Sequence, residues 1–323
     1  MLFRSKFTKF ESEPIAADSR QFKMETSRAF LLPIIAIVAA LTAYGRHSAL
    51  AEDKGQWNAY RLSNEQKAWF KRTLAASKAT WKIWAASNGT LDWRADPQNL
   101  PAGLTKPWPG AGYACFGGGD LGSIYTERAE LYDFVRDQRI EGFVTVSGDR
   151  HSFWAGYSAK ALPPQAFEPV GVAFICGSIS APGFAEALEH KLKGHPLRPL
   201  FVAERPGGKY ETTVNLTLKH GVKSALEYAK SGDLAAAKRV SNPDNAPHLD
   251  FIDMGGHGYA VVTAGTEAVE TEFVCIPRPI TRATTADGGP LRYRSIHRAE
   301  RWRPGERPKL QQRFVEGDAP LST

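Results

Sequence analysis

A short apolar run that ends in a polar turn constrains the fold of this chain more than any other feature. Four β-prone residues, Phe143 to Val146, are followed directly by Ser147-Gly148-Asp149-Arg150-His151-Ser152. The pattern predicts a buried strand that ends in a tight turn, and such turns at the carboxyl ends of strands are where open α/β sheets bind ligands. Asp149 and His151 could there offer an oxygen and a nitrogen to a metal ion. The alternative is an ordinary surface turn with a capping Asp149 and a solvated His151.

Helical and strand-like segments alternate around this turn. Ser63-Asn64-Glu65-Gln66 has the form of a capping box, and Thr126 is a candidate cap for a second helix. The sequence predicts helices over 64–77, 127–138, 184–193, 221–230 and 233–240, and strands over 81–86, 143–147, 170–176, 257–263 and 269–275, the last two forming a hairpin. This order favours an α/β layered domain.

Positive charge gathers near the C-terminus of a chain with an otherwise globular composition. The 323 residues are 42% hydrophobic and 23% charged, with a net charge of +7. Much of the excess comes from Arg292, Arg294, Arg298, Arg301, Arg303, Arg307, Lys309 and Arg313. We therefore assign 281–323 to a basic, Pro-containing arm lying over the domain surface. The stretch lacks aromatic residues at stacking spacing, so nucleic acid is not an expected partner.

The three cysteines are too few and too far apart for a zinc motif or a disulfide scaffold. Cys176 and Cys275 each end a strand-like run, which is typical of small buried hydrophobic residues. One disulfide, which could also involve Cys115, stays open if the chain is exported.

The first 51 residues have the pattern of an export signal. Ala29 to Tyr44 is a run of sixteen uncharged residues, shorter than the roughly 20 that span a bilayer. Ser48-Ala49-Leu50-Ala51 suits a signal peptidase, which predicts a mature start near Glu52 and a periplasmic or extracellular protein. The alternative is a single membrane anchor at 29–44, the one part of the chain expected to contact a membrane. Ser27-Arg28-Ala29-Phe30-Leu31 looks like a twin-arginine signal that lacks one arginine, so the export route stays open.

Several motifs together resemble a known family. Ser147-Gly148-Asp149-Arg150-His151-Ser152 follows Tyr125-Thr126-Glu127-Arg128 and a helix, with Trp81-Lys82-Ile83 before it and Pro247-His248-Leu249 and Gly256-His257-Gly258-Tyr259 after it. In this order they resemble the later half of the catalytic domain of the PhoD-like (alkaline phosphatase D) metallophosphatases. The resemblance covers the chain from about Gly55 and gives a domain at 55–280. One departure is Leu121, since an aromatic residue often follows the Asp that Asp120 would match.

The resemblance implies a calcineurin-like β-sandwich of two mixed sheets flanked by helices. It also implies hydrolysis of small phosphomonoesters or phosphodiesters by a metal cluster, with iron and calcium as the ions. Asp149 and His151 match the family's Gly-Asp-x-His motif at the metal centre. Arg150 or His257 could stabilise charge on the phosphate, although His257 fits a structural role equally well. His248 and Asn88 are further candidates for polar contacts.

The acidic motifs that the family places in its first half are not found in this sequence. The sandwich is therefore expected to be incomplete at its N-terminal half, with two ligands where a binuclear site needs roughly six. One interpretation is a working phosphatase whose missing half comes from a complementing chain or an upstream reading frame. The other is a truncated, inactive remnant. A non-catalytic alternative is an exported protein that binds anionic polymers through its basic arm.

Overall fold

The computed structural model describes residues 62–104, 112–115, 121–122, 124–278, 284, 289–321 and 323. Its largest sheet has five strands in the order β1 (Lys82–Ala85), β4 (Phe143–Ser147), β6 (Pro169–Ile175), β5 (Phe153–Ala159) and β9 (Leu249–Asp253). Strands β1, β4 and β6 are parallel, and β5 is antiparallel to both β6 and β9. Strands β1, β4, β6 and β9 therefore all run in one direction, so their carboxyl ends share one edge of the sheet.

A second, antiparallel sheet covers one face of the first. It contains β10 (His257–Ala264), β11 (Ala268–Ile276), β12 (Tyr293–Glu300) and β13 (Leu310–Gly317), in that order. The two sheets share an apolar core to which Phe153, Phe174 and Phe251 contribute from the first sheet and Phe273 and Tyr293 from the second. Two short antiparallel pairs, β2 (Arg94–Ala95) with β3 (Ala114–Cys115) and β7 (Ala203–Arg205) with β8 (Lys209–Glu211), complete the described strands.

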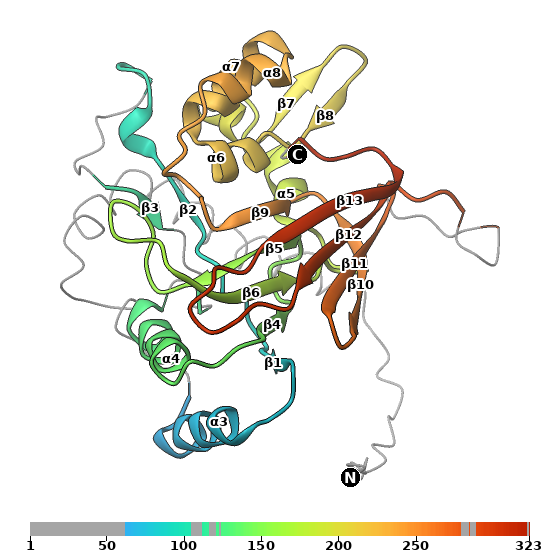
Figure 1. Ribbon diagram of the computed structural model, residues 1–323. Coiled ribbons are helices and arrows are strands. Elements are labelled where there is room, and N and C mark those ends of the chain that lie inside the picture. The colour runs from blue at the N-terminus through green and yellow to red at the C-terminus, as the bar shows by residue number, and fades with distance from the viewer. Residues whose placement is uncertain are drawn as a thin grey trace, which may run out of the picture.

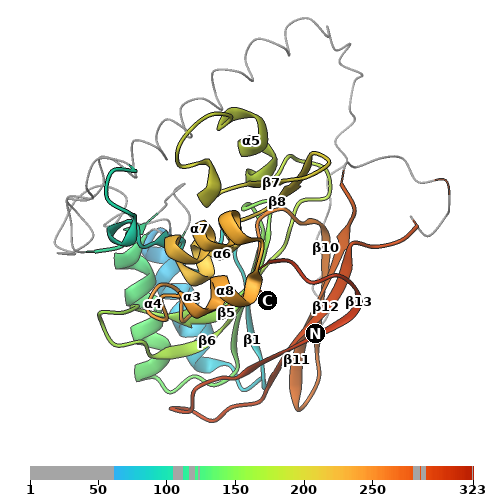
Figure 2. The same ribbon diagram turned by 90° about the horizontal axis from the view of Figure 1, so that it is seen from above.

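Helices pack on the opposite face of the five-stranded sheet (Figures 1 and 2). They are α3 (Asn64–Ala76), α4 (Tyr125–Asp137), α6 (Val214–His220), α7 (Val222–Ser231) and α8 (Leu234–Arg239). Helix α5 (Phe184–Lys191) follows β6. Two short 3-10 turns, η3 (Pro97–Asn99) and η4 (Arg198–Leu200), come after β2 and α5 in the chain. Alternate residues of one strand serve the two cores. Val172 and Phe174 face the second sheet, whereas Ala173 and Ile175 face the helices. The predicted α/β class is confirmed.

Most sequence-predicted elements lie close to their expected positions. The strand before the polar turn spans Phe143–Ser147, as predicted, and β10 and β11 form the expected hairpin. The Ser63 capping box forms, with the Ser63 hydroxyl and the Gln66 side chain each accepting a backbone amide. Thr126, in contrast, is not a cap, because α4 begins at Tyr125 and its N-cap residue is Ile124.

The C-terminal region differs from the expected surface arm. Residues 293–300 and 310–317 form β12 and β13, and Tyr293 is fully buried. The arginines of β12 point outward between buried neighbours and pair with acidic residues of β11, Arg294 with Glu272 at 3.4 Å and Arg298 with Glu270 at 2.9 Å. Arg294 and Arg298 therefore belong to a sheet face on which they are paired, whereas Arg301, Arg303, Arg307 and Lys309 lie in the segment between β12 and β13.

Two further expectations concern the cysteines and the membrane. Cys115, Cys176 and Cys275 are all free thiols, and Cys275 is buried as predicted while Cys176 is half-buried. In the described part of the chain, no helix is both long and apolar enough to cross a membrane. The leader at 1–51, including the run at 29–44, and Asp120 lie outside the described residues.

Candidate functional site

Polar loops meet at the edge where the parallel strands of the first sheet end. Asn88 follows β1, Asp149 and His151 follow β4, Ser178 follows β6, and His257 follows β9. Because these strands run in the same direction, their carboxyl-terminal loops lie along one edge, which is where α/β sheets commonly bind ligands. The sequence-predicted turn is therefore joined there by residues from three other loops.

Asp149 and Asn88 touch each other across two of these loops. The Asn88 amide nitrogen donates to Asp149 Oδ2 at 2.9 Å, and Asn88 Oδ1 accepts from the Ser87 hydroxyl at 3.1 Å. Asn88 thus holds one oxygen of Asp149 in a fixed direction. Asn88, a candidate for a polar contact because it follows a strand, thus lies beside Asp149.

The turn itself has an uncommon backbone. Asp149 and His151 have φ angles of 72° and 50°, in the left-handed region that residues with a Cβ seldom adopt. Such conformations cost roughly 1–3 kcal/mol each and persist where surrounding contacts enforce them, often at functional sites. Contacts with neighbouring residues, rather than the intrinsic backbone preferences of Asp149 and His151, therefore maintain the conformation of this turn.

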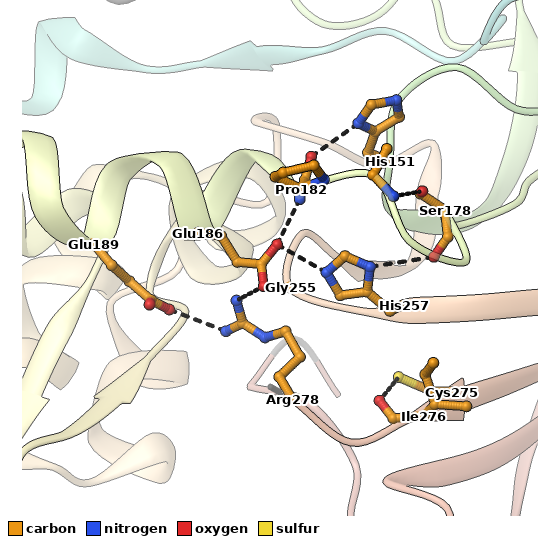
Figure 3. A network of polar contacts seen from close by, with 12 residues as sticks. His151, Ser178, Pro182, Glu186, Glu189, Gly255, His257, Cys275, Ile276 and Arg278 are labelled. Carbon is orange, nitrogen blue, oxygen red and sulfur yellow. Dashed lines mark hydrogen bonds and ion pairs between the residues drawn. The ribbon is translucent and has the colours of Figure 1, made fainter. Parts of the chain in front are cut away.

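One of those neighbours fixes the ring of His151. Its Nδ1 lies 2.9 Å from the carbonyl oxygen of Pro182, in the loop between β6 and α5 (Figure 3). A carbonyl only accepts, so Nδ1 carries the proton in this contact, and in the neutral ring Nε2 keeps its lone pair. Metal-binding histidines characteristically have their second nitrogen held in this way.

The structure places Arg150 beneath the turn rather than at its surface. Its side chain is buried, with the guanidinium 4.5 Å from the Trp154 ring centroid, and it donates to the Leu91 carbonyl. Gly89 and Gly122 pack so closely on the guanidinium that a Cβ at either position would collide with it. In this arrangement Arg150 supports the loops from below, and the phosphate contact predicted for it would need the side chain to move.

His257 is buried and engaged at both ring nitrogens. Its Nδ1 lies 3.2 Å from the Ser178 carbonyl and its Nε2 lies 2.9 Å from Glu186 Oε2 (Figure 3). Both partners are acceptors, so both contacts form together only when both nitrogens carry protons. This geometry favours the structural role over direct contact with a phosphate.

His248 lies deeper still. Its side chain is 1% exposed, and its Nε2 lies 2.9 Å from the Asp92 carbonyl. Burial lowers the pKa of His248 to about 4. The ring is therefore neutral near pH 7 and packed inside the domain, away from the Asp149 turn.

Two acidic residues near this edge were missed at the sequence level. Glu186, in the first turn of α5, contacts His257 and Arg278, the latter at 3.1 Å. Asp253, fully buried at the end of β9, accepts from the Tyr293 hydroxyl and from the Gly255 amide, each at 3.0 Å. Glu186 accepts from the Gly183 amide, but Gly183 has no side chain to complete a capping box, so the sequence carried no full capping signal for Glu186. Asp253 ends a strand that carried no clear alternation.

Asp149 and His151 are residues of the type that binds metal ions, but they are too few to form a metal cluster. Asp149 offers a carboxylate and His151 an imidazole nitrogen, which match the ions the family implies. Within the described residues, however, no group of three or more His, Cys, Asp or Glu side chains is close enough to hold a metal. Asp149 and His151 alone therefore supply too few ligands for a metal cluster.

Comparisons with known proteins agree with the motifs. The family model described as PhoD-like phosphatase matches residues 15–273, a range that begins inside the predicted leader. No curated protein matches. A solved structure titled "Structure of PhoD" matches with a TM-score of 0.48 and 15% identity, over 80% of this chain and 36% of that one. The chain thus spans about a third of the length of that structure. Because the family model covers well over half of its residues, the chain belongs to the PhoD-like phosphatase family.

Proposed function

We propose that this chain is a metal-dependent phosphoester hydrolase that acts at the Asp149 turn. One observation carries the proposal. Loops after β1 and β4 bring Asn88 to 2.9 Å from Asp149, on the same edge to which His151 is fixed through Nδ1. Family membership supplies the reaction class, hydrolysis of a phosphomonoester or phosphodiester. The identity of the ions, iron and calcium, is part of the proposal and rests on the resemblance alone.

The roles of the chain's own residues follow from their contacts. Asp149 supplies a carboxylate whose orientation Asn88 fixes, and His151 supplies Nε2 because Pro182 holds Nδ1. Bound metal ions would clamp phosphoryl oxygens and lower the pKa of a bound water. Since the described residues provide too few ligands, we propose that the remainder come from outside them, with a complementing chain as one source.

Turnover of two simple substrates tests this proposal. The purified chain, loaded with iron and calcium, is assayed with p-nitrophenyl phosphate and bis(p-nitrophenyl) phosphate, and its metal content is measured. We expect Asp149→Ala to abolish both turnover and metal retention. Asp137→Ala, an exposed carboxylate at the end of α4, is the matched control and should change neither.

A chain that retains no metal and turns over neither substrate, both alone and after mixing with an extract of the producing cell, would contradict the proposal. The alternative is then a non-catalytic protein that binds anionic polymers. Polyphosphate binding that survives Asp149→Ala and weakens with salt would favour it. The ion pairs of Arg294 and Arg298 on the outer sheet face reduce the positive charge available for such binding.

We also propose export, on the sequence of Ala29–Tyr44 and Ser48–Ala51. N-terminal sequencing of the protein from the producing cell tests it, together with fractionation. A mature start near Glu52 in the periplasm or medium is expected. Retention of residues 29–44 in the membrane fraction would support the anchor instead.

A further inference from the structure

The Pro182–Gly183 turn, which holds the ring of His151, is itself held by the carboxylate of Glu186. Pro182, whose carbonyl meets His151 Nδ1, is followed by Gly183, the N-cap residue of α5. The Gly183 amide donates to Glu186 Oε2 at 2.8 Å. A Cβ on Gly183 would lie 3.4 Å from the His151 carbonyl oxygen, so this residue also packs directly on the backbone of the Asp149 turn. Whatever holds Gly183 therefore holds the acceptor of His151.

Glu186 is anchored at both of its oxygens (Figure 3). Oε2 also meets His257 Nε2 at 2.9 Å, and Oε1 meets Arg278 at 3.1 Å. Arg278 in turn pairs with Glu189, one helical turn further along α5, at 3.0 Å. The carboxylate thus connects the start of α5 to the start of β10 and to Arg278, two residues after the end of β11.

The charge state of Glu186 agrees with this anchoring. Burial raises its pKa, but the Gly183 amide, His257 and Arg278 together lower it below the usual value. A charged acceptor makes shorter and stronger hydrogen bonds than a neutral one. Glu186 is therefore suited to hold the Gly183 amide in one place.

We infer that Glu186 is a positioning residue for His151. It acts through the Pro182–Gly183 turn and sets the ring so that Nδ1 is protonated and Nε2 faces outward with its lone pair. The inference rests on the proposed function only in giving His151 a role at the site. The observed link is a chain of contacts from Arg278 and His257 through Glu186 and Gly183 to Pro182 and His151.

The tautomer of His151 tests the inference without any assay of activity. It is measured by ¹⁵N NMR of the imidazole nitrogens at a pH where the ring is neutral. The full chain should show Nδ1 protonated and Nε2 unprotonated. Glu186→Ala should give a mixture of both tautomers, because the Pro182 carbonyl is no longer held. Glu186→Gln, which keeps an oxygen for the Gly183 amide, should restore most of the original state. His151→Ala assigns the resonances.

Glu189→Ala is the matched control, because it removes the other carboxylate on Arg278 without touching the turn. It should leave the His151 tautomer unchanged. A purely structural role for Glu186 would lower the free energy of unfolding while the tautomer stays as in the parent chain, and that result would overturn the inference. An equal effect of Glu189→Ala would overturn it as well.

Activity gives a second, separable readout. If the parent chain hydrolyses phosphoesters, Glu186→Ala should lower kcat/KM about 10-fold, the lower end of the range for losing a partner that touches a metal-binding histidine directly, with rescue by Glu186→Gln. If the parent chain is inactive but the tautomer responds as expected, the proposed function fails and the positioning role stands.

Discussion

His151 and His257, at the strand-end edge, have different surroundings from His297, in the core between the sheets. At the edge, His151 and His257 meet acceptors: the Pro182 carbonyl for the first, and the Ser178 carbonyl and Glu186 for the second. In the core between the sheets, His297 is fully buried, with its ring 4.8 Å from those of both Phe251 and Phe273 and the Ser295 hydroxyl 3.1 Å from its Nε2. Burial between aromatic rings favours the neutral form of His297. The polar loops at the edge, not the residue type, distinguish the candidate site from a histidine that packs in the core.

The pH dependence of stability gives the largest expected contrast. Burial, aided by Lys219, lowers the pKa of His297 to about 3, and burial lowers that of His248 to about 4, from an ordinary value of 6.5. Between about pH 4 and pH 6.5, the unfolded chain therefore binds more protons at these two histidines than the folded chain does. Stability should fall as pH drops below about 6.5, and these two residues should contribute a slope of at most about 2.7 kcal/mol per pH unit.

Urea unfolding measured from pH 7 to pH 4 checks this slope. His297→Phe keeps the aromatic packing and removes one titrating ring, so it should remove about half of the contribution of the two histidines. An unchanged slope in that variant would show that carboxylates account for the acid sensitivity instead.

The inter-sheet core should be the next most sensitive region. Phe273 is fully buried and lies 4.9 Å from Phe153 and 5.8 Å from Phe251, between ring centroids. Phe273→Ala should lower the free energy of unfolding by about 3–5 kcal/mol, because it removes apolar contacts and leaves a cavity. Urea titration at pH 7 measures it. Val315→Ala, on the exposed side of β13, is the control and should change it by less than about 0.5 kcal/mol.

Arg150 follows the edge residue Asp149 but packs on Leu91 and Trp154 of the core on the helix side, so its substitution sharpens the comparison. Arg150→Lys keeps the charge but loses the planar contact with Trp154 and the hydrogen bond to Leu91. We expect the free energy of unfolding to fall by about 1–2 kcal/mol. If kcat instead falls strongly while the urea midpoint stays constant, Arg150 contacts the phosphate, as the sequence first suggested.

The smallest effect on stability is expected at the edge itself. Asn88→Ala removes the amide that holds Asp149 and leaves a half-exposed loop position otherwise unchanged. The free energy of unfolding should change by less than about 0.5 kcal/mol, while kcat/KM should fall roughly 10-fold because Asp149 loses its fixed direction. A stability loss comparable to that of Phe273→Ala would show that the edge is part of the core.

The secondary structure was predictable where local pattern and tertiary role agree. The Phe143–Ser147 strand, the Ser63 capping box and the β10–β11 hairpin carry their signals within a few residues. Strand β5 was missed because both of its faces are covered, so Phe153–Ala159 shows no alternation of apolar and polar residues. Strand β12 does alternate between buried and half-buried residues. Its buried positions include the polar residues Ser295 and His297, so the sequence shows no clear apolar period there, and the many arginines suggested a surface arm instead.

The candidate site was predictable only in part for a similar reason. Asp149 and His151 were identified because a strand and a Gly-containing turn place them at a sheet edge. Glu186 was not, because its partners Arg278 and His257 are 92 and 71 residues away along the chain. Arg150 was a candidate because it lies within the motif, but the direction of its side chain depends on contacts with Gly89 and Trp154.

The sequence by itself determined the layered α/β class, the strand that ends at the Asp149 turn and, through the order of its motifs, membership of the PhoD-like phosphatases. The tertiary structure alone decided which polar residues of that turn face outward. It buried Arg150, engaged both nitrogens of His257, and held His151 through Pro182 and Glu186. Local patterns fix backbone conformation over a few residues, whereas burial and hydrogen-bond partners depend on segments that meet only after folding.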